Sequence, residues 1–227
     1  MALRRYRTVL FDLDGTVLDS IGMIMASLRH ALQAHLAWEP ADPVLVRGVG
    51  TPLREQLHGH ASDAHRARGQ GAPPDALVDA LVAAYLDHNR ARHDAEIRPF
   101  PDALATLTRL ADAGIALGIV TSKPQDIARR GLEICGLAHL FPVVVGADDV
   151  RRPKPDPEPV HVALEALGAP AGTALFVGDS PHDLHAGRAA GVATAAALWG
   201  PFPREVLAPA TPSHWVETLA DLLALGD

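Results

Sequence analysis

The chain has 227 residues, of which 48% are hydrophobic and 21% are charged, as in a folded globular protein with a sizeable core. Its formal net charge of -7 argues against nucleic acid as a main partner, because such proteins carry a basic surface. Cys135 is the single cysteine, which excludes a disulfide within the chain, and no apolar run is long enough for a membrane span. We therefore expect a cytoplasmic protein with neither nucleic acid nor membrane as a partner.

The first third of the chain predicts one buried strand followed by helices. The strand spans 8–12 and is apolar at consecutive positions, as in a parallel sheet covered on both faces. Ser20 occupies the N-cap position of a helix over 21–36, whose apolar residues recur at helical spacing. The pattern stays helical to Arg98, most clearly over 74–92, with a polar, glycine-rich loop expected over 61–73.

After Pro99, helices and strands alternate. The predicted helices cover 101–113, 124–135, 158–167 and 181–190, and the predicted strands cover 115–120, 143–145, 174–177 and 192–198. This alternation indicates right-handed βαβ units and a parallel sheet. We predict an α/β fold with a Rossmann-like, doubly wound parallel sheet formed by 1–16 and 99–227, and a helical insert over 17–98.

Polar side chains follow the strands of this sheet, at the edge where open α/β sheets bind ligands. They are Asp12, Asp14, Thr121, Ser122, Lys123, Asp148, Asp149, Lys154, Asp179, Ser180 and Asp183. Taken singly, Asp19, Asp148, Asp149 and Asp183 also fit ordinary acidic surface loops. Asp183 has a structural alternative as well, because Ser180 and Pro181 place it at the third position of a helix, where it would stabilise the start. As a group, the side chains are expected to converge.

The chemistry of this group indicates phosphoryl transfer. Carboxylates gathered at one edge raise one another's pKa, and a hard cation with oxygen ligands, which suits Mg²⁺, relieves this repulsion. The cation and Lys154 would offset the charge of a bound phosphate. Asp12 could then attack phosphorus and form an aspartyl-phosphate, while Asp14 exchanges protons with the leaving oxygen and with water.

The use of lysine gives a separate indication. Of the 20 lysines and arginines, only Lys123 and Lys154 are lysines. A chain that uses arginine at every other basic position keeps a compact ammonium group where it needs one. Both lysines follow strand ends, so we expect them at the site.

Four segments resemble the motifs of the haloacid dehalogenase superfamily. They are 11–17 with its Asp-x-Asp-Gly-Thr pattern, the strand that ends at Thr121, Lys154 within Arg-Pro-Lys-Pro-Asp-Pro, and 178–183. All four occur in order and together span nearly the whole chain. The resemblance implies a hydrolase with a doubly wound core and, over 17–98, a C1-type cap that closes over the site.

The resemblance also assigns roles to matching residues. Asp12 would be the nucleophile and a metal ligand, and Asp14 the acid/base that gives Mg²⁺ its backbone carbonyl. Asp179 would be the second carboxylate ligand, with Asp183 beside it or acting through water. The residues expected to hold the phosphoryl group are Gly15, Thr16, Thr121, Ser122, Lys123 and Lys154, with Lys154 bridging to Asp12.

Within the superfamily, the chain looks most like phosphoglycolate phosphatases and PpaX-type pyrophosphatases. The similar segments are 118–123, 148–159, 198–200 and the cap segment 48–53. In the last of these, Gly50 and Thr51 would position substrate, as a helix N-terminus offers amides to an anion; a plain loop-to-helix turn is the alternative.

We therefore expect a Mg²⁺-dependent phosphatase acting on a small phosphorylated metabolite, most like phosphoglycolate, as a monomer or homodimer. Pyrophosphate hydrolysis and a sugar-phosphate mutase reaction on the same core are alternatives. A phosphate-sensing protein or a phospho-receiver domain is the non-enzyme alternative, but receiver domains are compact and have no such helical insert. A phosphonate hydrolase of this superfamily would need a cap lysine, and 15–122 contains none.

Overall fold

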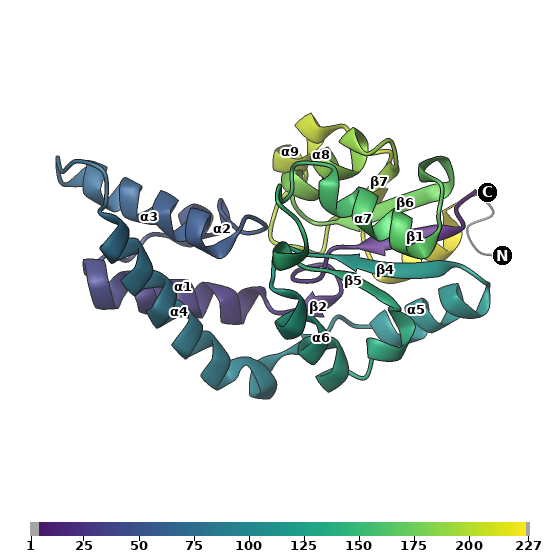
Figure 1. The fold of residues 1–227 in the computed structure, drawn as a ribbon, viewed down its shortest axis with the longest axis horizontal. Coiled ribbons are helices and arrows are strands. Elements are labelled where there is room, and N and C mark those ends of the chain that lie inside the picture. Colours follow the sequence, from purple (N-terminus) through teal and green to yellow (C-terminus); the bar gives the residue numbers. More distant parts are fainter. Residues whose placement is uncertain (1–4, 226–227) are drawn as a thin grey trace.

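The computed structural model describes residues 5–225 of the chain. Its centre is a 6-stranded sheet with the strand order β5-β4-β1-β6-β7-β8, in which every pairing is parallel. Helices cover both faces of this sheet, and a bundle of further helices lies beside it (Figure 1). The predicted α/β fold with a doubly wound parallel sheet is confirmed.

The strands of the large sheet are β1 (Thr8–Phe11), β4 (Ala116–Val120), β5 (Val143–Val145), β6 (Ala174–Gly178), β7 (Ala193–Ala197) and β8 (His214–Val216). In the central strand, Leu10 lies opposite Gly118 on one side and Phe176 on the other. The sequence did not predict β8. This strand has three residues at the sheet edge and only Val216 is buried, so it lacks the apolar run that reveals the central strands.

Alternate side chains of β1 pack into opposite layers. Val9 and Phe11 join the core beneath α5 (Ala103–Asp112), α6 (Gln125–Ile134) and η5 (Leu219–Ala224). Leu10 packs with α7 (Glu158–Leu167) and α8 (Pro181–Ala189) on the other face. Burying both faces of the strand explains its continuous apolar sequence. Short elements complete this part: η1 (Ala138–Leu140), η2 (Ala147–Asp149), η3 (Ala171–Thr173), α9 (Arg204–Leu207) and η4 (Ala208–Ala210).

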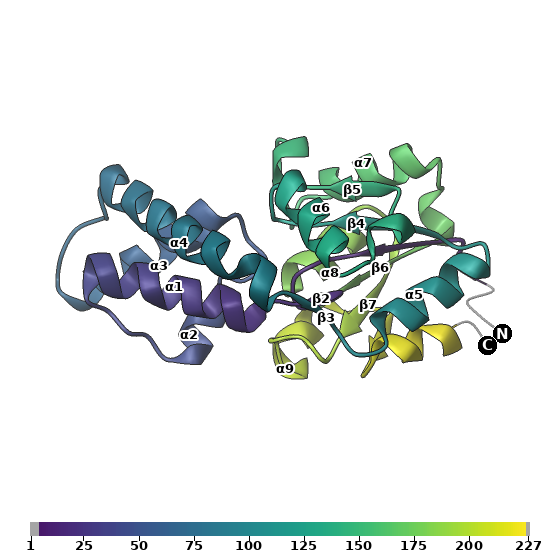
Figure 2. The ribbon, with the colours of Figure 1, turned by 90° about the horizontal axis from the view of Figure 1, so that it is seen from below.

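The bundle beside the sheet consists of α1 (Ile21–Leu36), α2 (Asp42–Val46), α3 (Leu53–Ala67) and α4 (Asp75–Glu96). A shared apolar core, which includes Leu28, Leu32 and Leu81, holds these helices together. The chain enters and leaves the bundle through β2 (Leu18–Asp19) and β3 (Arg98–Pro99), which pair antiparallel and lie between bundle and sheet (Figure 2). Within the described residues, no helix combines the length and the apolar character that crossing a bilayer requires.

One local expectation, the extent of the loop after α3, was wrong. The predicted loop over 61–73 is shorter, because α3 continues to Ala67; its buried face is made of small residues such as Ala61 and Ala64, which give a weak periodic signal. Ser20 is the N-cap residue of α1, as predicted, although its side chain makes no cap hydrogen bond. Its hydroxyl donates instead to Asp14 Oδ1 at 2.5 Å.

Candidate active site

The loop after β1 turns sharply and brings the first motif against Asp179, which directly follows β6. Gly15 has φ +86°, a conformation that residues with a side chain rarely adopt. A Cβ atom at this position would stand 2.7 Å from Asp179 Oδ2. Glycine is therefore required here by both conformation and space, and the loop closes against Asp179.

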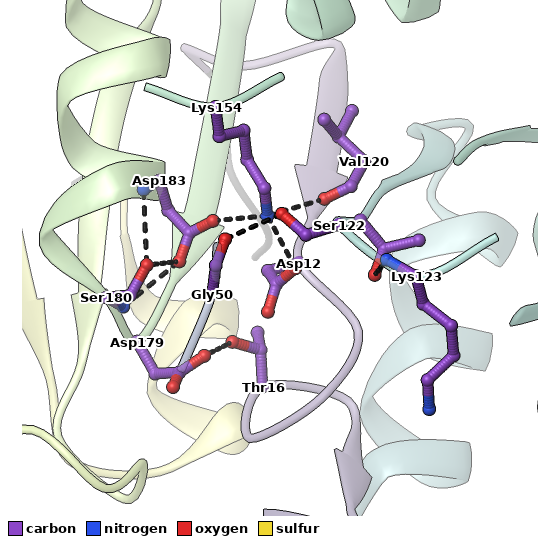
Figure 3. A network of polar contacts seen from close by, with 11 residues as sticks. Asp12, Thr16, Gly50, Val120, Ser122, Lys123, Lys154, Asp179, Ser180 and Asp183 are labelled. Atoms are coloured by element: carbon purple, nitrogen blue, oxygen red, sulfur yellow. Dashed lines mark hydrogen bonds and ion pairs between the residues drawn. The ribbon is translucent and has the colours of Figure 1, made fainter. Parts of the chain in front are cut away.

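Lys154 is buried at the centre of the site. Its Nζ donates to Asp12 Oδ1 at 2.7 Å, to Asp183 Oδ1 at 2.6 Å and to the carbonyl of Val120 at 3.1 Å (Figure 3). Residues from β1, from the loop after β5 and from α8 thus meet at one ammonium group. The expected convergence of Asp12, Lys154 and Asp183 is what the structure contains.

Asp183 stabilises the start of α8, as its position in the sequence suggested, and it also contacts Lys154. Its Oδ2 accepts from the Ser180 backbone amide at 3.0 Å and from the Ser180 hydroxyl at 2.6 Å, which forms a capping box at the start of α8. Its Oδ1 remains available to Lys154. The helix start therefore fixes the carboxylate that orients Lys154.

Asp179 is almost completely buried and lies next to Asp12 and Asp183. The Thr16 hydroxyl donates to its Oδ1 at 2.5 Å, and its Oδ2 has no hydrogen-bond donor within residues 5–225. Gly15 and Thr16, which were expected at the phosphate, therefore lie against Asp179. In this position they support the Asp179 carboxylate.

The electrostatics of this cluster are unbalanced in favour of negative charge. Asp12, Asp179 and Asp183 each offer an oxygen, and these oxygens lie within 4.8 Å of one another. Burial raises the pKa of Asp12 to about 7 despite the nearby Lys154 ammonium, and burial together with Asp12 raises the pKa of Asp179. For Lys154, burial alone would lower the pKa, but Asp12 and Asp183 raise it above its ordinary value.

These shifts describe three buried carboxylates near one ammonium, which pairs directly with two of them, Asp12 and Asp183. Lys154 stays charged because it has two anionic partners, whereas the carboxylates are not neutralised by a single positive charge. A group of buried oxygen ligands with an unpartnered Asp179 Oδ2 fits a hard divalent cation. The residues present are therefore suited to hold a metal ion.

Asp14 lies at the boundary between this cluster and the helical bundle. Its Oδ1 accepts from Lys123 Nζ at 2.7 Å and from the Ser20 hydroxyl at 2.5 Å. Lys123, which was expected at the phosphate, thus contacts the second aspartate of the first motif in this structure. The two lysines of the chain each hold one aspartate of that motif.

Backbone amides without hydrogen-bond partners lie close to Asp12 in the sequence and at the end of β4. The amides of Leu13, Asp14 and Ser122 have no hydrogen-bond partner within the described part of the chain, whereas the Thr121 amide donates to Val145. Thr121 Oγ1 accepts from the Lys123 amide at 3.2 Å. Unpartnered amides next to Asp12 can bind the oxygens of an anion.

A cavity of about 350 Å³ opens above Asp12, between the sheet edge and the bundle. Asp12, Asp14, Thr121, Ser122 and Lys123 line its lower part, and the bundle contributes the upper part, including Gly50 and Thr51. The Ser122 hydroxyl donates to the Gly50 carbonyl at 2.6 Å. This bond joins the bundle directly to the strand-end loop beside the cavity.

Other polar residues of the sequence lie away from the cavity. Asp148 and Asp149 accept from Gln125 at the start of α6 and so stabilise that loop. Arg54 pairs with Asp75 and Asp79 on the bundle surface, and Arg152 pairs with Glu158. Asp148 and Asp149 therefore fit the alternative interpretation, that of an ordinary acidic loop outside the site.

Sequence reasoning missed the residues that the bundle supplies. Ile24, Gln56, Tyr85, Asn89 and Arg90 all line the cavity, and Ser20 holds Asp14. Burial raises the pKa of Tyr85, so its phenol is neutral. Helical periodicity in α4 predicted the helix, but it could not tell which side of α4 faces the sheet.

Comparisons with known proteins agree with this fold and site. The family model for haloacid dehalogenase-like hydrolases matches residues 9–197. Pyrophosphatase PpaX of Bacillus velezensis is 34% identical over 223 residues, covering 98% of this chain and 97% of the relative. Pyrophosphatase PpaX of Bacillus pumilus is 35% identical over 218 residues, covering 96% and 95%. The chain therefore belongs to the haloacid dehalogenase-like hydrolase family.

Solved structures share the same architecture. A haloacid dehalogenase-like hydrolase from Bacteroides fragilis superposes with a TM-score of 0.84 at 28% identity, covering 96% of this chain and 99% of that one. A predicted phosphoglycolate phosphatase from Haemophilus somnus has a TM-score of 0.86 at 24% identity, covering 98% and 99%; this likeness concerns the fold. The resemblance to the family and the assignment to its phosphatase enzymes are confirmed.

Proposed function

We propose that this chain is a Mg²⁺-dependent phosphatase that hydrolyses a small phosphate monoester through a phosphoaspartyl intermediate on Asp12. The observation that supports this most is the buried Lys154, whose Nζ joins Asp12 and Asp183 beside a third buried aspartate. In this proposal 1–16 and 99–227 form the catalytic core and 17–98 form the cap.

The first half of the reaction transfers the phosphoryl group to the protein. An Asp12 carboxylate oxygen attacks phosphorus, the bond from phosphorus to the leaving oxygen breaks, and Asp14 supplies the proton that makes the leaving group an alcohol. Lys154 holds Asp12 Oδ1 at 2.7 Å and so orients the nucleophile. The Thr121 hydroxyl and the free amides of Leu13, Asp14 and Ser122 hold the phosphoryl oxygens.

The second half returns the protein to its starting state. Asp14 removes a proton from water, the hydroxide attacks phosphorus, and the bond to Asp12 breaks to release phosphate. Lys123 and Ser20 hold Asp14 Oδ1, which fixes this carboxylate for both proton transfers. The Gly50 contact with Ser122 keeps the cap over the site, where it excludes bulk water.

Asp12, Asp179 and the Asp14 carbonyl would hold Mg²⁺, with Asp183 beside them. When bound, the cation supplies positive charge that offsets the phosphate and lowers the repulsion between carboxylates. Three buried carboxylates with oxygens within 4.8 Å of one another, of which Lys154 pairs with only two, support this assignment.

Two substrates fit the proposal as particular candidates. Phosphoglycolate is the main candidate, and pyrophosphate is the alternative because relatives at 34% and 35% identity carry the name pyrophosphatase. We also propose a cytoplasmic enzyme, consistent with the net charge of -7 and the single cysteine.

A phosphate-release assay tests the function. We expect turnover with Mg²⁺, loss of turnover with EDTA, and a fall in kcat of at least about 10⁴-fold for Asp12→Asn. Asp19→Asn, an exposed aspartate next to the cap connection, is the matched control and should retain activity. Unchanged turnover in a folded Asp12→Asn protein would show that another group is the nucleophile.

A further inference from the structure

The cap half of the cavity has a distinct chemical character. Apolar side chains from three parts of the bundle contribute to its wall: Ile24 from α1, Val49 and Leu53 before and in α3, and Leu86 from α4. Ile127 from α6, outside the bundle, also lines the cavity. Such a wall favours carbon over water.

One cation borders this wall. Arg90 lines the cavity next to Tyr85, Leu86 and Asn89, which share one face of α4. Within the described residues, its guanidinium has neither an ion pair nor a side-chain hydrogen bond. The other arginines of the insert all donate to a carboxylate or a carbonyl: Arg29, Arg47, Arg54, Arg66, Arg68, Arg92 and Arg98.

A second unsatisfied donor lies in the same wall. Gln56 is 7% exposed, and its Nε2 is buried with no hydrogen-bond partner. A buried amide without a partner is uncommon, because it has lost its hydrogen bonds to water without gaining others. A ligand oxygen in the cavity would satisfy it.

We propose that the cap half of this cavity binds the leaving group of an organic phosphate monoester that has a short carbon skeleton and an anionic end, which Arg90 binds. The proposal rests on the proposed phosphatase function and deepens it. The carbon skeleton packs against Ile24, Val49 and Leu86, and Gln56 donates to an oxygen of the leaving group. Pyrophosphate, which has no carbon, is then a poor substrate.

Charge supports the assignment of Arg90 to the leaving group. The other cations near the cavity already have partners, since Lys154 serves Asp12 and Asp183 and Lys123 serves Asp14. A carboxylate at the far end of a substrate therefore finds one free guanidinium. Arginine binds a carboxylate through two parallel donors, which gives direction as well as attraction.

The test compares Arg90→Gln with Arg92→Gln, a control two residues along α4 whose arginine pairs with Glu96. Substrates are phosphoglycolate, p-nitrophenyl phosphate and pyrophosphate. We expect Arg90→Gln to raise KM for phosphoglycolate by about 10- to 100-fold, since it removes a charged hydrogen bond. Its kcat/KM for p-nitrophenyl phosphate should stay within about threefold of the unsubstituted enzyme. Gln56→Leu should raise KM for phosphoglycolate by about 3- to 10-fold.

Calorimetry separates this proposal from the proposed function. In an Asp12→Asn background, Arg90→Gln should weaken phosphoglycolate binding by about 10- to 100-fold and leave methyl phosphate, which has no carboxylate, unchanged. Equal losses for both ligands, or pyrophosphate turnover that equals or exceeds that of the carbon esters, would overturn the proposal. Absence of phosphate release from every substrate would instead overturn the phosphatase function, and the calorimetric comparison would still decide the role of Arg90.

Discussion

Charged side chains are paired in one half of the site and unpaired in the other. The first half is the cluster at the strand ends, and the second is the face of the bundle that lines the cavity. In the cluster, the charges of Asp12, Lys154 and Asp183 are buried and paired with one another. On the cap face, Arg90 borders an apolar wall without any partner among the described residues. In our proposals, the core cluster carries out the chemistry, and Arg90, the one charged residue that the bundle places at the cavity within the described part of the chain, selects the substrate.

The two regions should also differ in what a substitution does to stability. A buried charge that loses its partner destabilises a protein by about 3–5 kcal/mol, whereas an exposed charge contributes about 0–1 kcal/mol. Substitutions in the core cluster should therefore change both folding and catalysis. Substitutions on the cap face should change substrate preference and leave the free energy of unfolding almost unchanged.

The largest effect is expected at Lys154. Lys154→Met removes the ammonium from Asp12 and Asp183, so we expect it to lower the free energy of unfolding by about 3–5 kcal/mol. The same change should abolish measurable turnover, because the nucleophile loses its orienting partner. Urea unfolding without metal, followed by a phosphate-release assay, measures both.

Lys123→Met is the matched comparison for Lys154→Met. Its ion pair with Asp14 is partly exposed, with 12% and 14% of the two side chains accessible, so its loss should lower the free energy of unfolding by about 1 kcal/mol. Equal destabilisation by the two substitutions would show that the buried Lys154 and the partly exposed Lys123 contribute alike to stability.

A change of pH is expected to alter stability less than Lys154→Met does, but more than a substitution at the contact between bundle and sheet. Without metal, burial raises the pKa of Asp12 to about 7 and also raises that of Asp179, whereas an unfolded aspartate titrates near pH 4. Because the folded pKa is the higher one, the stabilising contribution is complete below about pH 4 and is lost as the pH rises towards 7. We expect the Tm in EDTA to fall over this range.

Mg²⁺ should reverse that fall by binding the ionised carboxylates. The increase in Tm on adding Mg²⁺ is therefore expected to be larger at pH 7 than at pH 5. Asp12→Asn removes one of the titrating groups and should flatten the pH dependence in EDTA. An equal Mg²⁺ effect at both pH values would argue against a cation among these carboxylates.

The smallest effect is expected where the two regions touch. Ser122→Ala removes the 2.6 Å hydrogen bond to the Gly50 carbonyl, which is worth about 1 kcal/mol to the closed arrangement. We expect KM to rise by about 2- to 10-fold with little change in kcat. Ser62→Ala, at a cap serine whose hydroxyl has no partner in residues 5–225, is the control. A KM unchanged by Ser122→Ala would mean that this bond does not hold the cap closed.

Sequence patterns predicted the elements with a strong apolar pattern better than those with a weak one. The first strand and the capping box at Ser180 and Asp183 follow from local chemistry, and both occur as expected. The edge strand β8 and the full length of α3 did not follow, because three half-buried residues and a face of alanines give weak periodic signals. The hydroxyl of Ser20 donates to Asp14 instead of receiving a hydrogen bond from a backbone amide at the start of α1.

The sequence by itself determined the fold class and the position of several carboxylates and two lysines at the strand ends, since these depend on local pattern and on the common edge that parallel strands share. Tertiary structure alone decided which aspartate each lysine holds and which residues of α3 and α4 face the cavity. The reason is physical: an amphipathic helix specifies that one face is buried, but the partner of that face, and the residues at its border, depend on how the bundle sits on the sheet.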